Sequence, residues 1–245
     1  MSDQYWFILF PALFIVAFMY SSVGHGGASG YLALMAIFGF HQADMKATAL
    51  LLNIFVSLIA FIRFYRAGYF KMKLFLPFAI MSVPAAFLGG MLEVEPDLYK
   101  KILGCLLLFP VARLFGLFGQ ESDRIKEGNF FVSLIIGAGI GFLSGLIGIG
   151  GGIILSPIIL LFHWGRMKET AAASALFIFV NSLSGLGGQF TGGVNFDPSM
   201  FAMLAIALAG GLAGSYYGVH KFNTLFLRRL LAFVLLIASV KLLSI

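Results

Sequence analysis

Charge is what this sequence has least of. Only 11% of the 245 residues are charged, whereas 60% are hydrophobic and the mean hydropathy is +1.01. A soluble domain carries about 25% charged residues, so this composition cannot cover a surface that faces water. It excludes an ordinary soluble enzyme, a nucleic-acid-binding domain and a disordered chain. The formal charge of +6 comes from basic residues in short loops between apolar runs, which is typical of membrane proteins.

Cysteine and histidine are also scarce. The single cysteine, Cys105, excludes an internal disulfide and a thiolate metal cluster, and the four histidines form no ligand motif. Paired acids and activated nucleophiles are lacking too, so the sequence predicts no enzyme, metal or cofactor. A signal peptide begins with a basic segment, but the first six residues hold no Lys or Arg. The first apolar segment is therefore expected to be retained.

Long apolar runs, in contrast, fill the chain. A helix needs about 20 apolar residues to cross a bilayer. The segments of about that length are 46–62, 74–91, 98–117, 170–190, 199–218 and 224–244. Two further stretches, 6–40 and 129–162, are too long for one straight span and are interrupted by glycine. The sequence therefore predicts an all-α polytopic membrane protein.

The pattern repeats itself along the chain. The segment 22–27 is similar to 146–151, and Thr48-Ala49-Leu50 is similar to Ser174-Ala175-Leu176. Each half is thus a glycine-broken segment followed by three spanning helices. The expected organisation is a first repeat over 1–118, a linker loop over 119–128 and a second repeat over 129–245.

Loop charges indicate how the two halves are related. Loop 61–74 is strongly basic, but its counterpart 191–198 holds only the charge of Asp197. Because basic loops stay in the cytoplasm, equivalent loops of the two halves should lie on opposite sides, which predicts inverted repeats. If the loops alternate between the two sides of the membrane, each broken segment starts and ends on the same side. Both termini then lie outside. Each broken segment would be a re-entrant hairpin of two short helices; a single crossing by each is the competing topology.

These residues resemble a known family. The run 141–157 (GFLSGLIGIGGGIILSP), followed by Ala171–Leu176, resembles the TauE/SafE sulfite exporter family, and 24–34 with 46–50 is similar to a variant of its first-half motif. The resemblance covers essentially the whole chain. It implies a transporter of the bacterial inner membrane for sulfur-containing anions such as sulfite, thiosulfate, sulfonates or sulfoacetate. His25 departs from the commoner glycine-only motif.

The glycine breaks have a physical interpretation of their own. A hairpin turn inside the membrane leaves helix N-termini near 29–32 and 152–156, whose free N–H groups and partial positive charge favour an anion. Glycine lets an oxyanion approach the backbone closely. Two hairpins that enter from opposite sides would meet in one site at the repeat interface. The alternative is that the glycines only permit close packing of helices.

Polar residues around these breaks are the candidate ligands of the anion. His25 is expected deep in the membrane, where it would bind the anion or carry a coupled proton, or simply bond a carbonyl as a neutral ring. No charged residue falls in the middle of a span, so binding would rely on amides, hydroxyls and backbone N–H groups. The candidate substrate-binding residues are Ser22, Gly24, His25, Gly26, Gly27, Ser29, Tyr31, Thr48, Asn53, Gly148, Gly150, Gly151, Gly152, Ser156, Ser174 and Asn181. Each hydroxyl or amide has the alternative role of bonding a neighbouring helix.

The sequence thus predicts a secondary transporter that moves a small sulfur-containing anion by alternating access, with His25 as the candidate proton carrier. Its expected partners are that anion and the lipid bilayer, and no nucleic acid. Two alternatives remain open: an anion channel, and a membrane subunit that transports nothing and docks a partner.

Overall fold

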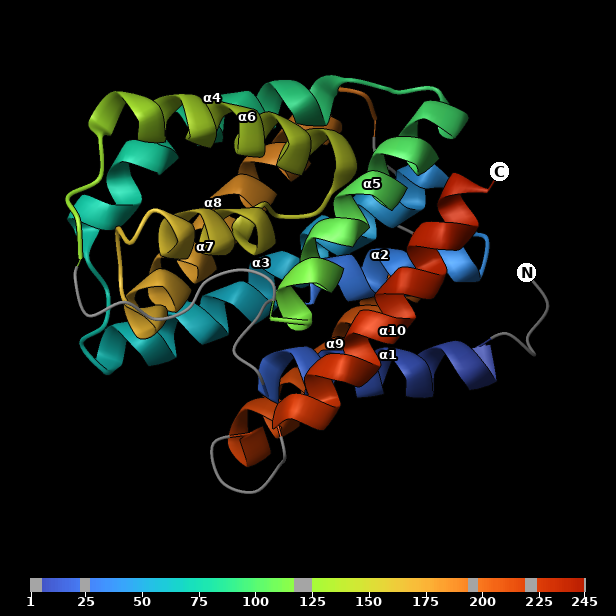
Figure 1. Cartoon of the computed structure of the whole chain (residues 1–245). Helices are drawn as coiled ribbons and strands as arrows, with labels where there is room; N and C mark the ends of the chain where they lie inside the picture. The colour runs from blue at the N-terminus through green and yellow to red at the C-terminus, as the bar shows by residue number, and fades with distance from the viewer. Residues whose placement is uncertain (1–5, 23–26, 117–124, 194–197, 219–223, 245) are drawn as a thin grey trace.

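The structure is a computed structural model that describes residues 6–22, 27–116, 125–193, 198–218 and 224–244 (Figure 1). Over these residues the chain forms helices and no strand, which confirms the all-α prediction. The helices are α1 (Trp6–Ser22), α2 (Ala28–Ile37), α3 (Gln42–Arg66), α4 (Met72–Met91), α5 (Pro96–Leu114), α6 (Phe130–Ile147), α7 (Gly152–Leu161), α8 (Met167–Phe190), α9 (Pro198–Gly218) and α10 (Thr224–Leu243).

Four helices of the described chain are long and apolar enough to cross a membrane: α3, α4, α6 and α8. Three of them contain segments expected to span, namely 46–62, 74–91 and 170–190. The helix α3 is 25 residues long and begins at Gln42, four residues before the apolar run that predicts it. Its first turn holds the half-buried polar residues Gln42 and Asp44.

Both glycine-broken stretches form two helices, but the two are unequal. The helices α1 and α2 have 17 and 10 residues, and α6 and α7 have 18 and 10. The prediction of two short helices is wrong for α6, which is as long as a span. The reason is its packing on α4, where glycines one helical turn apart let the two backbones touch. The glycines Gly137, Gly141 and Gly145 lie against the carbonyls of Phe78, Ser82 and Ala86.

The chain nevertheless turns back at each break. The rings of Trp6, at the start of α1, and Phe40, just after α2, are 6.3 Å apart. In the second half the N–H of Lys126 donates to the carbonyl of His163 at 2.8 Å, so the entry to α6 lies beside the exit from α7. The two ends of each broken segment thus lie close together, so α1–α2 and α6–α7 are two helical hairpins.

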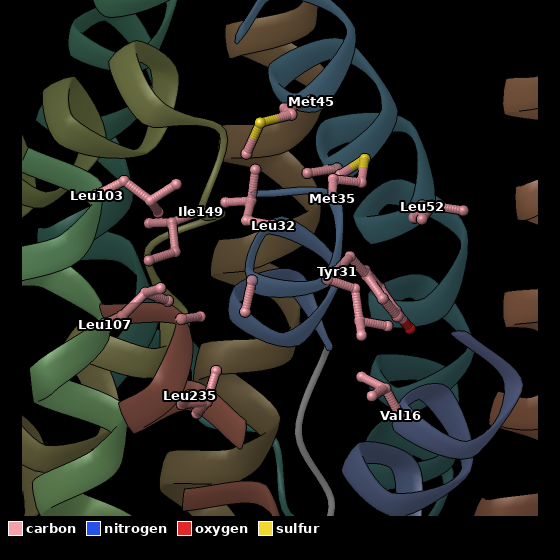
Figure 2. Close-up of a cluster of buried hydrophobic side chains, with 14 of the residues drawn as sticks. Val16, Tyr31, Leu32, Met35, Met45, Leu52, Leu103, Leu107, Ile149 and Leu235 are labelled. Atoms are coloured by element: carbon pink, nitrogen blue, oxygen red, sulfur yellow. The ribbon is translucent and has the colours of Figure 1, made fainter. Parts of the chain in front are cut away.

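The two halves of the chain are interlocked. The most extensive helix packings, α4 on α6, α1 on α9, α4 on α8, α3 on α8 and α5 on α10, all join one half to the other. Figure 2 shows the resulting core, where Leu32 of the first hairpin and Ile149 of the second lie in one hydrophobic cluster with Leu103 and Leu235. The two hairpins thus share a core in the middle of the molecule.

Candidate functional site

The turn between α6 and α7 is built from glycines in conformations that other residues rarely adopt. The φ angles of Gly148, Gly150 and Gly151 are +88°, +76° and +74°. The N–H of Gly148 closes α6 on the carbonyl of Ser144 at 2.8 Å, and Gly151 is the N-cap of α7. Because left-handed φ values cost little only for glycine, the sequence dictates this sharp reversal locally.

Backbone N–H groups are left free at this turn. Among the residues that the structure describes, the N–H groups of Ile149, Gly150 and Gly151 donate to no acceptor. They precede the first turn of α7, a helix of 10 residues, whose N-terminus carries a partial positive charge. All three residues are buried. Free N–H groups and a helix N-terminus together favour a negatively charged ligand.

The side chain of Asn53, on α3, lies against this turn. A Cβ atom placed on Gly150 would lie 2.6 Å from Nδ2 of Asn53 and 3.3 Å from Oγ of Ser182 on α8. Asn53 and Ser182 are fully buried, and their side-chain N and O atoms have no hydrogen-bond partner among the described residues. A buried polar group without a partner costs about 1–3 kcal/mol. These unpaired groups lie together at the N-terminus of α7.

Tyr31 lies in the first turn of α2, in the first hairpin. Its ring folds back over Gly27, the N-cap of α2, so that a Cβ on Gly27 would lie 2.6 Å from the Tyr31 hydroxyl. Tyr31 is fully buried, and its hydroxyl also lacks a partner within the described parts of the chain. Both short helices therefore begin next to an unsatisfied side-chain donor. The other buried side-chain atoms without a described partner belong to Thr48, Ser57, Ser144, Thr170, Asn181 and Gln189.

Several predicted ligands are already engaged with protein atoms. The hydroxyls of Ser156 and Ser174 lie 2.7 Å apart and join α7 to α8, and that of Ser156 also donates to the carbonyl of Gly152. Ser29 bonds Tyr20 at 2.7 Å in the same way. The Asn181 amide donates to a carbonyl of its own helix at 2.8 Å, while its oxygen has no partner among the described residues. The three serines thus join neighbouring helices, whereas the Asn181 amide bonds within α8.

The rest of the predicted first-half motif lies outside the described residues. This applies to Gly24, His25 and Gly26, and to the side chain of Ser22 at the end of α1. Of the predicted second-half residues, Gly152 begins α7 and packs against Ile178 and the carbonyl of Ser174.

Lys46 is the residue that sequence reasoning missed. Lys46 stands at the first position of the predicted span 46–62, not in its middle, and its side chain is buried, with 6% exposed. Its Nζ donates to three carbonyls at the end of α4: Gly90 at 3.0 Å, Leu92 at 3.2 Å and Gly89 at 3.4 Å. The backbone of Lys46 also lies against Gly148 of the turn. In the sequence, Lys46 stands directly before a long apolar run. A lysine at such a place can lie at the exposed end of a span or inside the protein, so the sequence alone did not show that it is buried.

Comparisons with known proteins identify a family of membrane transporters. The family model described as "Sulfite exporter TauE/SafE" matches residues 9–242. The chain is 36% identical over 239 residues to "Probable membrane transporter protein y4hK" of Sinorhizobium fredii, which covers 95% of this chain and 96% of the relative. It is 30% identical to "Probable membrane transporter protein ORF9" of a Sinorhizobium species (96% and 91% covered), and 26% identical to "Probable membrane transporter protein YjnA" of Bacillus subtilis (96% and 98%). No solved structure gives a significant match.

Proposed function

Because the chain belongs to the TauE/SafE sulfite exporter family, we propose that this membrane transporter carries a small sulfur-containing anion by alternating access. The substrate class comprises sulfite, thiosulfate, sulfonates and sulfoacetate. The chain would reside in the bacterial inner membrane with both termini outside. A transporter needs no activated nucleophile, and the groups gathered at the α6–α7 turn are donors and amides suited to binding.

One observation carries the proposal: the N-terminus of α7 presents free N–H groups beside the unsatisfied amide of Asn53. Sulfite and sulfonate groups have three acceptor oxygens around one sulfur, so they match a cluster of convergent donors. Hydrogen bonds to a charged partner contribute about 1.5–3 kcal/mol each. A few such bonds give the modest affinity of a substrate that must also be released.

Helix packing supports an inverted repeat as the scaffold for alternating access. If α1–α5 correspond to α6–α10, the packing of α1 on α9 corresponds to that of α6 on α4, and α2 with α10 corresponds to α7 with α5. The packings of α3 on α8 and α5 on α10 correspond to themselves, as they must around a twofold axis. The first hairpin opens just before α3 begins, and the second beside the loop that follows α3, where Lys168 donates to Tyr69. The hairpins thus open at opposite ends of α3, as inverted repeats require.

Proton coupling through His25 belongs to the same proposal. His25 is part of the glycine-rich segment between α1 and α2, outside the described residues. An imidazole titrates near neutral pH, so a histidine beside the anion would gain a proton when the anion binds. Uptake driven by an imposed pH gradient in the wild type, and lost in His25→Gln, would support this step.

Transport by purified protein in liposomes tests the proposed function. Vesicles loaded with buffer are placed in labelled sulfite, thiosulfate or methanesulfonate, with chloride and sulfate as comparisons. Saturable uptake of one sulfur-anion class, faster when the same anion is present inside, is expected. Current that rises linearly with voltage and does not saturate would support the channel, and vesicles that move none of these anions would support a docking subunit.

A further inference from the structure

We propose, resting on the function above, that Lys46 supplies the fixed positive charge that draws the anion to the α6–α7 turn. It acts on the substrate through its electric field and through the position it gives the turn, and it makes no direct hydrogen bond to the substrate. Lys46 is thereby a specificity-determining residue, which selects an anion over an uncharged molecule of the same shape.

The hydrogen bonds of Lys46 explain why the charge can be held inside the protein. Its three N–H groups have three acceptors, the carbonyls of Gly89, Gly90 and Leu92. These carbonyls close the C-terminal end of α4, which carries a partial negative charge that favours a cation. The ammonium group has thus exchanged its hydration shell for protein dipoles, and no donor of Lys46 is left for the substrate.

Among the described residues, no carboxylate forms an ion pair with the Lys46 ammonium group. The ion pairs recorded among the described residues join Lys71 to Glu169 and Lys100 to Asp97. Glu93, in the linker after α4, exerts an electrostatic effect on Lys46, but it is exposed and forms no ion pair with it. Carbonyl dipoles stabilise a buried cation without cancelling its net charge. A negative ion that arrives nearby supplies the missing compensation.

The position of Lys46 connects this charge to the site. A Cβ on Gly148 would lie 3.1 Å from the Cα and carbonyl oxygen of Lys46 and 3.4 Å from its Cγ, so the turn rests directly on this lysine. Asn53 follows seven residues later on the same helix, which corresponds to about 10 Å of axial rise. That rise separates the two backbones, while the ammonium group itself lies at the end of α4. For a charge about 10 Å from an anion, at an effective dielectric constant of about 20, the affinity changes by about tenfold.

The test compares variants that differ in charge but retain the ability to bond the carbonyls of α4. Lys46→Gln has no charge and still donates two N–H groups, and Lys46→Arg keeps both charge and donors. Lys241→Gln is the matched control, because Lys241 also donates to a helix-end carbonyl, that of Ile37 at 2.8 Å, but at an exposed position. For each purified variant, the melting temperature is measured against the concentration of methanesulfonate, and against its uncharged analogue dimethyl sulfone.

The concentration of methanesulfonate that gives half of the maximal stabilisation should rise about tenfold or more in Lys46→Gln. It should stay within about threefold of the wild type in Lys46→Arg and Lys241→Gln. Any effect of dimethyl sulfone should be the same in all of them. If Lys46→Gln does not fold, Lys46→Met provides the uncharged variant, since it fills the same space and leaves no buried donor behind.

Two negative results have different meanings. If wild type and Lys46→Gln respond to methanesulfonate at the same concentration, Lys46 only closes the end of α4 and the inference is wrong, while the proposed function stands. A lower melting temperature of Lys46→Gln without anion, combined with unchanged anion affinity, has that same meaning. If no sulfur-containing anion raises the melting temperature of the wild type or enters liposomes that contain it, the proposed function itself is wrong. The proposed role of Lys46 is then wrong as well.

Discussion

Nδ2 of Asn53 lies so close to the backbone of Gly150 that no methyl group fits between them: a Cβ on Gly150 would be 2.6 Å from that nitrogen. The contact joins α3 of the first half to the hairpin turn of the second. It also holds an amide without a described partner at the start of α7. This one relationship brings together α3, the glycine turn and the free donors.

Replacing Asn53 by Leu should weaken anion binding without loss of stability. The amide has no partner to lose within the described structure, and an apolar side chain of similar shape at a buried position is neutral or stabilising. A lost hydrogen bond to a charged ligand, about 1.5–3 kcal/mol, corresponds to roughly 10- to 150-fold weaker binding. Melting curves with and without sulfite measure both quantities.

Ser239→Ala is the control for that variant. Ser239 is also fully buried, but its hydroxyl donates to the carbonyl of Gly104 at 2.7 Å, between α10 and α5. The control should lower the melting temperature and leave the anion affinity unchanged. The opposite pattern, a destabilised Asn53→Leu that binds sulfite normally, would show that Asn53 is a packing residue.

Replacing Gly150 by Ala should lower stability and anion affinity together. The left-handed φ of +76° costs an alanine about 1–2 kcal/mol, and the new methyl group would displace Asn53 from the turn. Gly39→Ala separates the two effects, because Gly39 has φ +73° with open space around it. The control should show only the backbone cost, with normal sulfite uptake in liposomes. Equal behaviour of both variants would mean that the contact with Asn53 contributes nothing.

Replacing Gly141 by Ala should loosen the long arm of the second hairpin. The added methyl group would meet the backbone of Ser82 on α4, so the helices must separate, at a cost of about 1–3 kcal/mol. Gly139→Ala, on the same helix with nothing near its Cβ position, should be neutral or stabilise by up to about 1 kcal/mol. Thermal unfolding in detergent measures both, and an unchanged melting temperature of Gly141→Ala would contradict the packing of α6 on α4.

Labelling of introduced cysteines should place the two hairpin openings on opposite sides of the membrane. In a Cys105→Ser background, Ala43→Cys marks the first opening, Glu127→Cys the second and Ala67→Cys the loop between α3 and α4; all three positions are exposed. An impermeant thiol reagent added to intact cells should modify Ala43→Cys alone, and permeabilised cells should show all three. Modification of Ala43→Cys and Glu127→Cys from the same side would contradict inverted repeats.

Much of the helical pattern could be predicted from the sequence because it follows from local chemistry. Long apolar runs bounded by charged loops predict α3, α4 and α8, and clustered glycines predict the breaks between α1 and α2 and between α6 and α7. The length of α6 could not be predicted, because it depends on which backbone the glycines of α6 meet. Only the packing shows that this backbone belongs to α4.

Some residues of the candidate site could be predicted from the sequence, and others depend on tertiary contacts. Its glycines and Asn53 stand out in the sequence, since left-handed turns need glycine and a buried amide is costly. Whether a hydroxyl is free or bonded depends on residues far away in the chain, and so Ser156 and Ser174 pair with each other while Asn53 has no described partner. The sequence by itself determined the long apolar helices and the glycines that interrupt them. Only the tertiary structure decided that Lys46 is buried against the end of α4, because burial of a charge depends on acceptors that another helix brings to it.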